Sequence, residues 1–331
     1  MIKNDHDRRM KKRPDNCNRR SFILKMAMAG AAIQLAGIEG SGIGAYSTKP
    51  KRTVHVFSKP MQWLDYDGLA EVLSESGAEG IDLSVRPGGH VLPERVESDL
   101  TEAVNAAHKK GLKVEMIVTA ITGADEKYSE TIIKTASSLG IKFYRLGWLS
   151  YDEKTGILGT LQKLKPDFQR LADMNHKYNI HGAYQNHQGT NIGSAVWDLY
   201  ELLKDLDPEF IGCQYDIRHA VVEGGGSWPN GLKLIFPWIK CTDIKDFKWS
   251  LTDAKWNAES VPIGEGMVDF EEYFKIVKEY DIPGPISVHL EYPPFEHFDK
   301  VLPAAEKRKL FISAIRRDID KVKSYLSKYQ L

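Results

Sequence analysis

The chain has little cysteine, no excess of charge of one sign and no long apolar run. Only three cysteines occur among 331 residues, so the sequence is not a disulfide scaffold. The charge-free apolar stretch 26–38 is too short to cross a bilayer, which takes about 20 residues. No low-complexity tract occurs, and no glycine-rich phosphate-binding loop follows an apolar strand-like run, so we predict no nucleotide site. These absences leave a large globular fold.

The formal net charge of +0 conceals an uneven distribution. Residues 1–40 contain 9 Lys or Arg and 4 Asp or Glu, so the remainder of the chain is mildly acidic. Non-specific binding to nucleic acid needs a basic surface. We therefore predict no nucleic-acid partner.

The first 45 residues resemble a twin-arginine export signal followed by a linker. Arg19 and Arg20 precede an apolar pair, Lys25 and the weakly apolar segment 26–38. We expect the twin-arginine export machinery as a partner, a periplasmic or exported location, and a folded domain over 46–331. An anchored N-terminal helix is the alternative.

Short apolar, β-branched runs alternate with longer amphipathic segments from residue 53 onward. We predict strands over 53–58, 80–85, 112–119, 141–147, 180–186, 211–216, 238–244 and 286–291. We predict helices over 67–76, 93–110, 127–139, 166–178, 195–206, 269–280 and 303–329, and a short one near 230–235 after a Gly-rich loop. Helix stop signals are present, because Gly111 and Gly140 follow two of these helices.

Alternation of strands and helices is typical of a parallel sheet. Eight such units without a separate strand-rich block predict an α/β fold, a single-domain (βα)₈ TIM barrel. An open doubly wound sheet is the alternative. Such a sheet would normally carry a Gly-rich turn after the first strand, and the segment 58–62 is not one. Cys213 and Cys241 fall on neighbouring predicted strands, where we expect buried free thiols.

Polar side chains gather at the ends of these apolar strands, where a barrel places its catalytic groups. Buried charges cost free energy unless they are paired or bind a metal, so their concentration indicates a site. A ring of structural ion pairs is the alternative. The residues concerned are Asp82 with Arg86 and His90, Arg145, Gln185 with Asn186 and His187, Asp216 with Arg218 and His219, Asp243 with Lys245, and His289 with Glu291.

At these residues the segment 53–292 resembles the xylose isomerase-like barrel family of sugar epimerases, sugar-phosphate isomerases and some endonucleases. The resemblance is most specific in 184–187, Asp216-x-x-His219, Asp243-x-Lys245-Asp246, Gly264-Glu265-Gly266 and Glu291. It implies one metal ion held by a strand-five Glu, a strand-six Asp, a strand-seven His and a strand-eight Glu. Asp216 and Glu291 match this pattern, whereas Gln185 replaces the first Glu and Asp243 replaces the His.

The resemblance implies metal ligation by Gln185, Asp216, Asp243 and Glu291. Carboxylate and amide oxygens suit a hard divalent cation, so we expect Mn²⁺ or Mg²⁺. An amide does not titrate, so Gln185 cannot serve as one of the two bases that the epimerases of this family use.

The function we favour is that of a sugar isomerase or epimerase acting by proton abstraction next to a sugar carbonyl. Glu291 would take the proton, and His187 or His219 would replace the second base. A metal, or Lys245 with Arg145, would stabilise the enediolate oxygen.

We expect a carbohydrate as the substrate, and a homo-oligomer is possible. A 3-keto-glycoside lyase or hydratase and a non-catalytic sugar-binding barrel are the alternatives, and the acidic body disfavours an endonuclease of abasic DNA. Substrate contacts are expected from Asp82, Arg86, His90, Asn186, Trp148 and Trp249.

Overall fold

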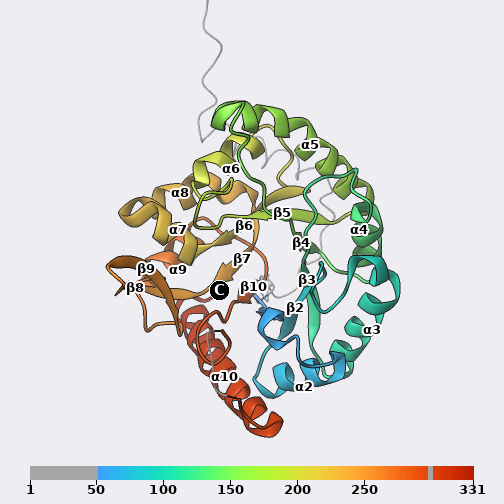
Figure 1. The fold of residues 1–331 in the computed structure, drawn as a ribbon, viewed down its shortest axis with the longest axis vertical. Coiled ribbons are helices and arrows are strands. Elements are labelled where there is room, and N and C mark those ends of the chain that lie inside the picture. The colour runs from blue at the N-terminus through green and yellow to red at the C-terminus, as the bar shows by residue number, and fades with distance from the viewer. Residues whose placement is uncertain (1–50, 297–300) are drawn as a thin grey trace, which may run out of the picture. The chain divides into compact units, whose positions relative to one another are not determined.

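The computed structural model describes residues 51–296 and 301–331, so the expected export signal lies outside the described residues. Eight parallel strands close into a barrel in the order β1-β10-β7-β6-β5-β4-β3-β2, and helices surround it (Figure 1). This confirms the predicted TIM barrel. Within the described ranges, no helix is both long and apolar enough to cross a membrane.

All eight predicted strands are present at the predicted places. They are β1 Val54–Phe57, β2 Gly80–Ser84, β3 Lys113–Val118, β4 Phe143–Arg145, β5 His181–Gln185, β6 Ile211–Asp216, β7 Ile239–Ile244 and β10 Ile286–Val288. Helices cover the outer face of these strands and side chains fill the inner face. Strands buried on both faces have nearly continuous apolar sequences, which is why the sequence pattern predicts them well.

The outer layer consists of helices that bury one apolar face each against the barrel. They are α2 Tyr66–Glu75, α3 Val96–Lys109, α4 Ser129–Ser138, α5 Gly156–Tyr178, α6 Val196–Leu203, α7 Ile217–Gly224, α8 Trp228–Ile235, α9 Phe270–Glu279 and α10 Ala304–Tyr329. Short 3₁₀ turns are η1 Lys59–Met61, η2 Pro93–Arg95, η3 Gly225–Ser227 and η4 Phe236–Trp238. Gly111 and Gly140 have φ of 74° and 82° just after α3 and α4, as glycines that end helices do.

The expected start of a helix at Pro166 is wrong. Helix α5 begins at Gly156 and contains Pro166 in its interior. Proline cannot donate the usual backbone hydrogen bond within a helix, but α5 packs on the core on both sides of this position through Leu161 and Phe168. Tertiary packing therefore carries the helix through the proline.

The segment after β7 is a β-hairpin that the sequence pattern did not predict. It consists of β8 Asp246–Thr252 and β9 Lys255–Val261, which pair antiparallel. The two turn residues, Asp253 and Ala254, have φ of 51° and 60°, the left-handed values that a tight hairpin turn needs. An Asp-Ala turn lacks the glycine that usually marks such a turn, so the sequence pattern favours a loop here.

The register of the barrel sets the strand ends side by side. Asp216 at the end of β6 is paired in register with Asp243 on β7, and Gln185 with Gln214 on β5 and β6. Cys213 and Cys241 are buried free thiols, as expected. The polar strand ends thus form one layer across the barrel.

Candidate active site

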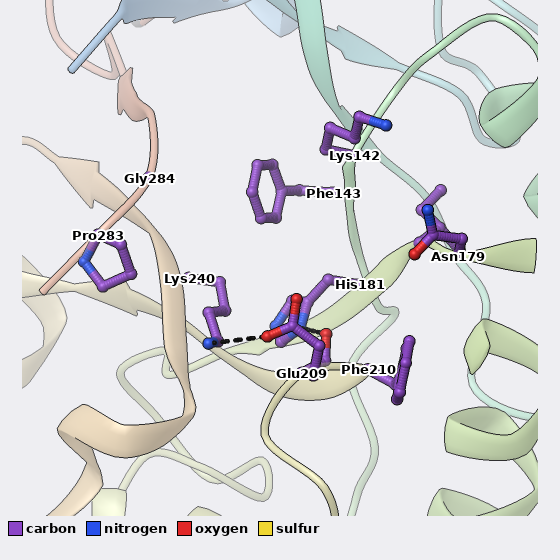
Figure 2. A pocket seen from close by; sticks show the side chains of 10 residues that line it. Lys142, Phe143, Asn179, His181, Glu209, Phe210, Lys240, Pro283 and Gly284 are labelled. Carbon is purple, nitrogen blue, oxygen red and sulfur yellow. Dashed lines mark hydrogen bonds and ion pairs between the residues drawn. The ribbon is translucent and has the colours of Figure 1, made fainter. Parts of the chain in front are cut away.

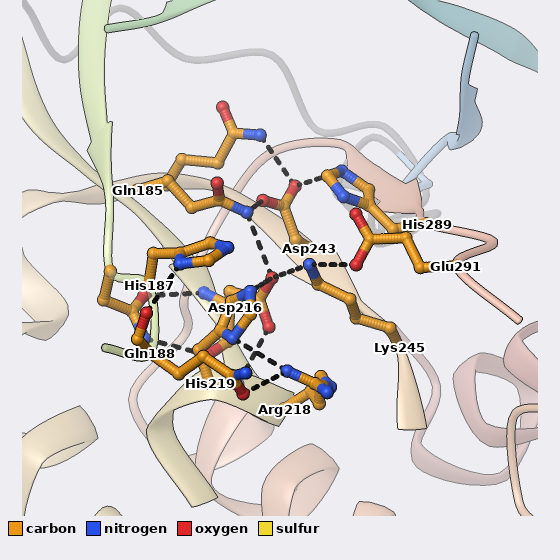
Figure 3. A network of polar contacts seen from close by, with 12 residues as sticks. Gln185, His187, Gln188, Asp216, Arg218, His219, Asp243, Lys245, His289 and Glu291 are labelled. Atoms are coloured by element: carbon orange, nitrogen blue, oxygen red, sulfur yellow. Dashed lines mark hydrogen bonds and ion pairs between the residues drawn. The ribbon is translucent and has the colours of Figure 1, made fainter. Parts of the chain in front are cut away.

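A cluster of buried polar side chains lies at the carboxyl ends of the strands (Figure 3). It is formed by Asp82, Arg145, Gln185, Gln214, Asp216, Asp243, Lys245, His289 and, half-buried, Glu291. All of them except Gln214 are among the residues expected from the strand ends to carry the site. Because buried polar groups are costly without partners, the partners of each decide what the cluster can do.

Arg145 fixes the orientation of Gln185. A guanidinium can only donate, and Nη1 of Arg145 donates to Oε1 of Gln185 at 2.8 Å. The amide nitrogen therefore faces the carboxylates: Nε2 donates to Oδ2 of Asp216 at 3.0 Å and to Oδ2 of Asp243 at 2.6 Å. Gln185 thus joins two neighbouring aspartates by donated hydrogen bonds.

Lys245 lies between two carboxylates. Its Nζ is 3.2 Å from Oδ2 of Asp216 and 3.1 Å from Oε2 of Glu291. Burial alone would lower the pKa of Lys245, but these two carboxylates raise it. Burial alone would raise the pKa of Glu291, but Lys245 and His289 lower it. The pair is therefore an ammonium and a carboxylate at neutral pH.

Of the two carboxylates that contact Lys245, Glu291 is the one that a substrate can reach. Its side chain is 21% exposed, whereas that of Asp216 is fully buried. Asp216 also binds the backbone: its Oδ1 accepts a hydrogen bond from the N–H of His219 at 3.1 Å and so caps helix α7. Asp216 therefore positions Lys245, and Glu291 faces the mouth of the barrel.

A second group joins β2, β7 and the end of β10. Nε2 of His289 lies 3.4 Å from Oδ1 of Asp243 and 3.8 Å from Oδ2 of Asp82. Burial alone would lower the pKa of His289, but Asp243 and Asp82 raise it to about 9. Gln214 donates to Oδ1 of Asp243 at 2.7 Å. Asp243 is thus approached by donors from three sides.

The rings of His187 and His219 pack against each other at a tilt of 44°, with centroids 3.9 Å apart, but have different partners. Arg218 donates to Nδ1 of His219 at 3.1 Å, so the proton of that neutral ring is on Nε2, 3.5 Å from Asp216. Nδ1 of His187 donates to the carbonyl of Gln188 at 2.8 Å, which leaves its Nε2 with a free lone pair. Burial lowers the pKa of both rings, and that of His187 falls to about 4.

These tautomers separate the roles of the two histidines. The ring of His187 is turned so that its second nitrogen points toward the centre of the cluster (Figure 3). A neutral imidazole with a free lone pair can take up a proton from a reacting group held against it. Nδ1 of His219 accepts from Arg218 and its Nε2 carries the proton, so this ring has no free lone pair, which favours a positioning role.

The residues expected to contact substrate are only partly brought together. Trp148 is 40% exposed and packs against His187 at 4.4 Å between ring centroids, with the Arg145 guanidinium 5.0 Å from its ring. Arg86 lies over the ring of Phe57 at 5.7 Å, and its pKa is lowered by burial despite Asp82 and Glu291. Both stand at the edge of the cluster.

Three other expected contacts have local structural partners. The side chain of Asn186 bonds the backbone N–H and carbonyl of Asp216 at 2.8 and 2.9 Å. His90 lies within hydrogen-bond distance of Ser84 and of the Met61 carbonyl. Trp249 lies on the hairpin strand β8, edge-on to Phe247 at 5.7 Å.

Two residues of the site were not assigned a role from the sequence. Gln214 shares strand parity with Asp216, a signal that could have identified it. Arg218 connects the hairpin to the site, because its Nη2 donates to the carbonyl of Ala258 at 2.7 Å and its Nη1 bonds Gln188. The hairpin was unforeseen, so this connection had no sequence signal.

A cavity of about 500 Å³ lies at the opposite end of the barrel (Figure 2). It is lined by residues at or before the starts of the strands, including Phe143, His181, Phe210 and Lys240. Active sites of such barrels lie at the carboxyl ends of the strands, while the amino ends serve stability. We therefore place the candidate active site at the polar cluster and not in this cavity.

The donor set of the cluster allows a direct test for a metal ion. At the four positions expected to bind one, Gln185 presents its N–H groups to the carboxylates and the Lys245 ammonium lies between Asp216 and Glu291. Those positions do not fit a metal. Among the described residues, Asp82, Asp243 and His289 form a buried group whose ligand atoms lie within 4.8 Å of one another, and this group can hold a divalent metal.

The family model described as "Xylose isomerase-like TIM barrel" matches residues 70–314. This is well over half of the chain, and the chain therefore belongs to that family. The resemblance inferred from the strand-end residues is confirmed at the level of the family.

Individual relatives are distant. "Inosose dehydratase 2" of Bacillus cereus is 27% identical over 145 residues, 40% of this chain and 48% of that protein. The chain thus spans about half the length of the curated relatives it matches. A "D-tagatose 3-epimerase-like protein" has a TM-score of 0.57 at 16% identity, covering 82% of this chain and 99% of that chain.

The solved structure of an "IOLI protein with a binding zinc atom" has a TM-score of 0.63 at 16% identity, covering 84% of this chain and 99% of that chain. At such identities the solved structures show a shared fold. The family is one of enzymes, with both dehydratase and epimerase-like members among these relatives.

Proposed function

We propose that the protein is a sugar isomerase or epimerase that removes a proton next to a sugar carbonyl. The observation that carries this proposal is the pair of Lys245 and Glu291 at the mouth of the barrel, 3.1 Å apart, beside the neutral ring of His187. A fixed cation beside a reachable carboxylate and a free lone pair supplies what enolisation needs.

In the proposed step the carbonyl oxygen of the substrate accepts a hydrogen bond from Lys245. The C–H bond on the neighbouring carbon breaks and its proton passes to the Glu291 carboxylate. The electron pair forms a carbon–carbon double bond, and the carbonyl oxygen takes up the negative charge. Lys245 stabilises that charge, and the nearby Arg145 adds to the positive field.

Return of the proton decides the product. Protonation of the other carbon of the enediolate gives an isomer, and protonation from the opposite face gives an epimer. Gln185 cannot take part, because its amide carries no titratable proton. His187 is the proposed second proton carrier: for an epimer, its Nε2 lone pair takes up the hydroxyl proton of the enediolate and passes it to carbon on the opposite face, while Glu291 returns its proton to oxygen.

Any divalent metal is proposed to bind to Asp82, Asp243 and His289. The ions we expect there are Mn²⁺ or Mg²⁺. Such an ion would act as a Lewis acid toward a substrate oxygen. The steps above use side chains of the chain itself and hold with or without it.

A second candidate is elimination of a β-leaving group from the same enediolate, which would make the protein a lyase acting on 3-keto-glycosides or related cyclic ketones. The observation that favours it is the asymmetry of the site, with a carboxylate as one base and an imidazole as the other. The similarity to an inosose dehydratase is compatible with it. A non-catalytic sugar-binding barrel is what remains if neither reaction occurs.

The test is incubation with free ketoses and with 3-keto-glycosides in D₂O, followed by NMR. We expect deuterium at a carbon next to the carbonyl, with isomeric products for an isomerase or epimerase. A released aglycone or water and an unsaturated ketone would identify the lyase.

Matched variants locate the chemistry. Glu291→Gln and His187→Asn are expected to slow exchange by about 10²–10⁴-fold, as loss of a general acid or base does. The exposed Glu279→Gln and His108→Asn are the controls. Exchange that survives both site variants would refute the assigned roles, and no exchange with any carbonyl sugar would favour the binding protein.

Export by the twin-arginine machinery to the periplasm or beyond remains our proposal for the location of the protein, with unphosphorylated sugars as the substrates met there. A fusion of residues 1–45 to a reporter tests it, with Arg19→Lys and Arg20→Lys together as the control. We expect export that the double substitution abolishes.

A further inference from the structure

The position that a metal would take between β6 and the end of β10 is filled by a side chain of the protein, that of Lys245. The Lys245 ammonium is 3.2 Å from Asp216 and 3.1 Å from Glu291, and its side chain is only 3% exposed. These are the two positions at which the chain keeps the carboxylates that the family resemblance assigns to the metal. A compact cation with three donors thus bridges the two carboxylates that would otherwise need a shared ion.

Gln185 is adapted to the same arrangement. Because Arg145 holds its oxygen, its N–H groups point at Asp216 and Asp243. A glutamate at this position would bring a third carboxylate against those two aspartates, and like charges at such distances are unfavourable without a cation between them. The amide removes that charge and supplies donors in its place.

The chain itself supplies as much positive charge at these positions as a divalent ion would. The four positions hold three carboxylates, from Asp216, Asp243 and Glu291, and the cations bonded to this set are Lys245 and Arg145, while His289 also lies 3.4 Å from Asp243. Lys245 and Arg145 alone give the same sum of charges with three carboxylates as a divalent metal would. An additional divalent ion at the four positions would leave an excess of positive charge there.

We propose that Lys245 and Gln185 together replace the metal ion at these four positions, so that an ammonium of the chain serves as the resident cation of the site. The proposal concerns what neutralises the carboxylates and does not rest on the proposed reaction. The group of Asp82, Asp243 and His289, which shares only Asp243 with the four positions, can still hold a metal.

The test measures Mn²⁺ binding by the full-length protein after any bound metal has been removed with a chelator. Binding is measured by electron paramagnetic resonance and by calorimetry. We expect Asp216→Asn to bind as much Mn²⁺ as the wild type. We expect Asp82→Asn to lose any Mn²⁺ that the wild type binds. Wild-type Mn²⁺ that survives Asp82→Asn but is lost on Asp216→Asn or Glu291→Gln would overturn the proposal.

A gain-of-binding variant gives the converse test. Gln185→Glu with Lys245→Met restores a carboxylate and removes the ammonium, so we expect one additional Mn²⁺ per chain and a Tm that rises with Mn²⁺. The exposed Gln330→Glu controls for the added carboxylate, and the exposed Lys134→Met controls for loss of a lysine. A folded double variant that gains no Mn²⁺ would also overturn the proposal. If the double variant does not fold, the wild-type comparison still decides.

Discussion

His181 provides a prediction that separates stability from chemistry, because it lies at the amino end of β5, away from the polar cluster. Its Nδ1 donates to the Glu209 carbonyl at 3.0 Å, and its side chain is buried. Burial lowers the pKa of His181 to about 4, against an ordinary value of 6.5. The folded protein therefore keeps this ring neutral under conditions in which the unfolded chain protonates it.

The sign and size of the effect follow from this difference in pKa. The folded state binds fewer protons than the unfolded state between pH 6.5 and about 4, so the contribution of His181 to stability is lost as the pH falls through that window. Linkage gives a loss of about 2 kcal/mol in the free energy of unfolding between pH 7 and pH 5.

Urea unfolding at pH 7 and pH 5 measures this quantity for the wild type, His181→Asn and the exposed His108→Asn. His181→Asn keeps a donor for the Glu209 carbonyl and removes the titration, so its stability should fall with acid by about 2 kcal/mol less than that of the wild type. His108→Asn should follow the wild type. An equal loss of stability in wild type and His181→Asn would refute the reasoning.

Two further predictions concern parts of the fold that support the site. The Asp246 carboxylate accepts four backbone N–H groups at 2.8–3.1 Å, so Asp246→Ala should lower the free energy of unfolding by at least about 3 kcal/mol. Asp269→Ala, which removes one exposed helix cap, should cost only about 1 kcal/mol in the same urea titration. Gly212→Ala should prevent folding or lower Tm sharply, because its Cβ would lie 2.0 Å from the Trp238 carbonyl oxygen. Gly226→Ala, which meets nothing within 4 Å, is the control, and equal Tm values for the two glycine variants would contradict the prediction.

The hairpin and the start of helix α5 are two features that the local sequence pattern does not predict correctly. The start of α5 was misplaced because proline usually begins helices, and only packing on both sides of Pro166 shows that it does not. The hairpin was missed because its turn, Asp253-Ala254, reaches left-handed backbone angles without glycine. In both cases contacts distant in sequence outweighed the local preference.

The sequence by itself determined the barrel and the ring of polar strand ends. Strands that are buried on both faces appear in the sequence as short apolar runs, and alternate residues of a strand point to the same face. The eight strands and the inward residues at their ends therefore follow from local patterns. The candidate site residues from Asp82 to Glu291 were identified in this way.

Only the tertiary structure decided what those residues do to one another. Lys245 and Glu291 are 46 positions apart, and Arg145 and Gln185 are 40 apart. Whether the nitrogen or the oxygen of an amide faces a carboxylate, and which cation lies between two acids, depends on atoms brought within hydrogen-bond distance by closure of the barrel. For that reason the sequence predicted a metal at Gln185, Asp216, Asp243 and Glu291, whereas the folded chain places its own ammonium there.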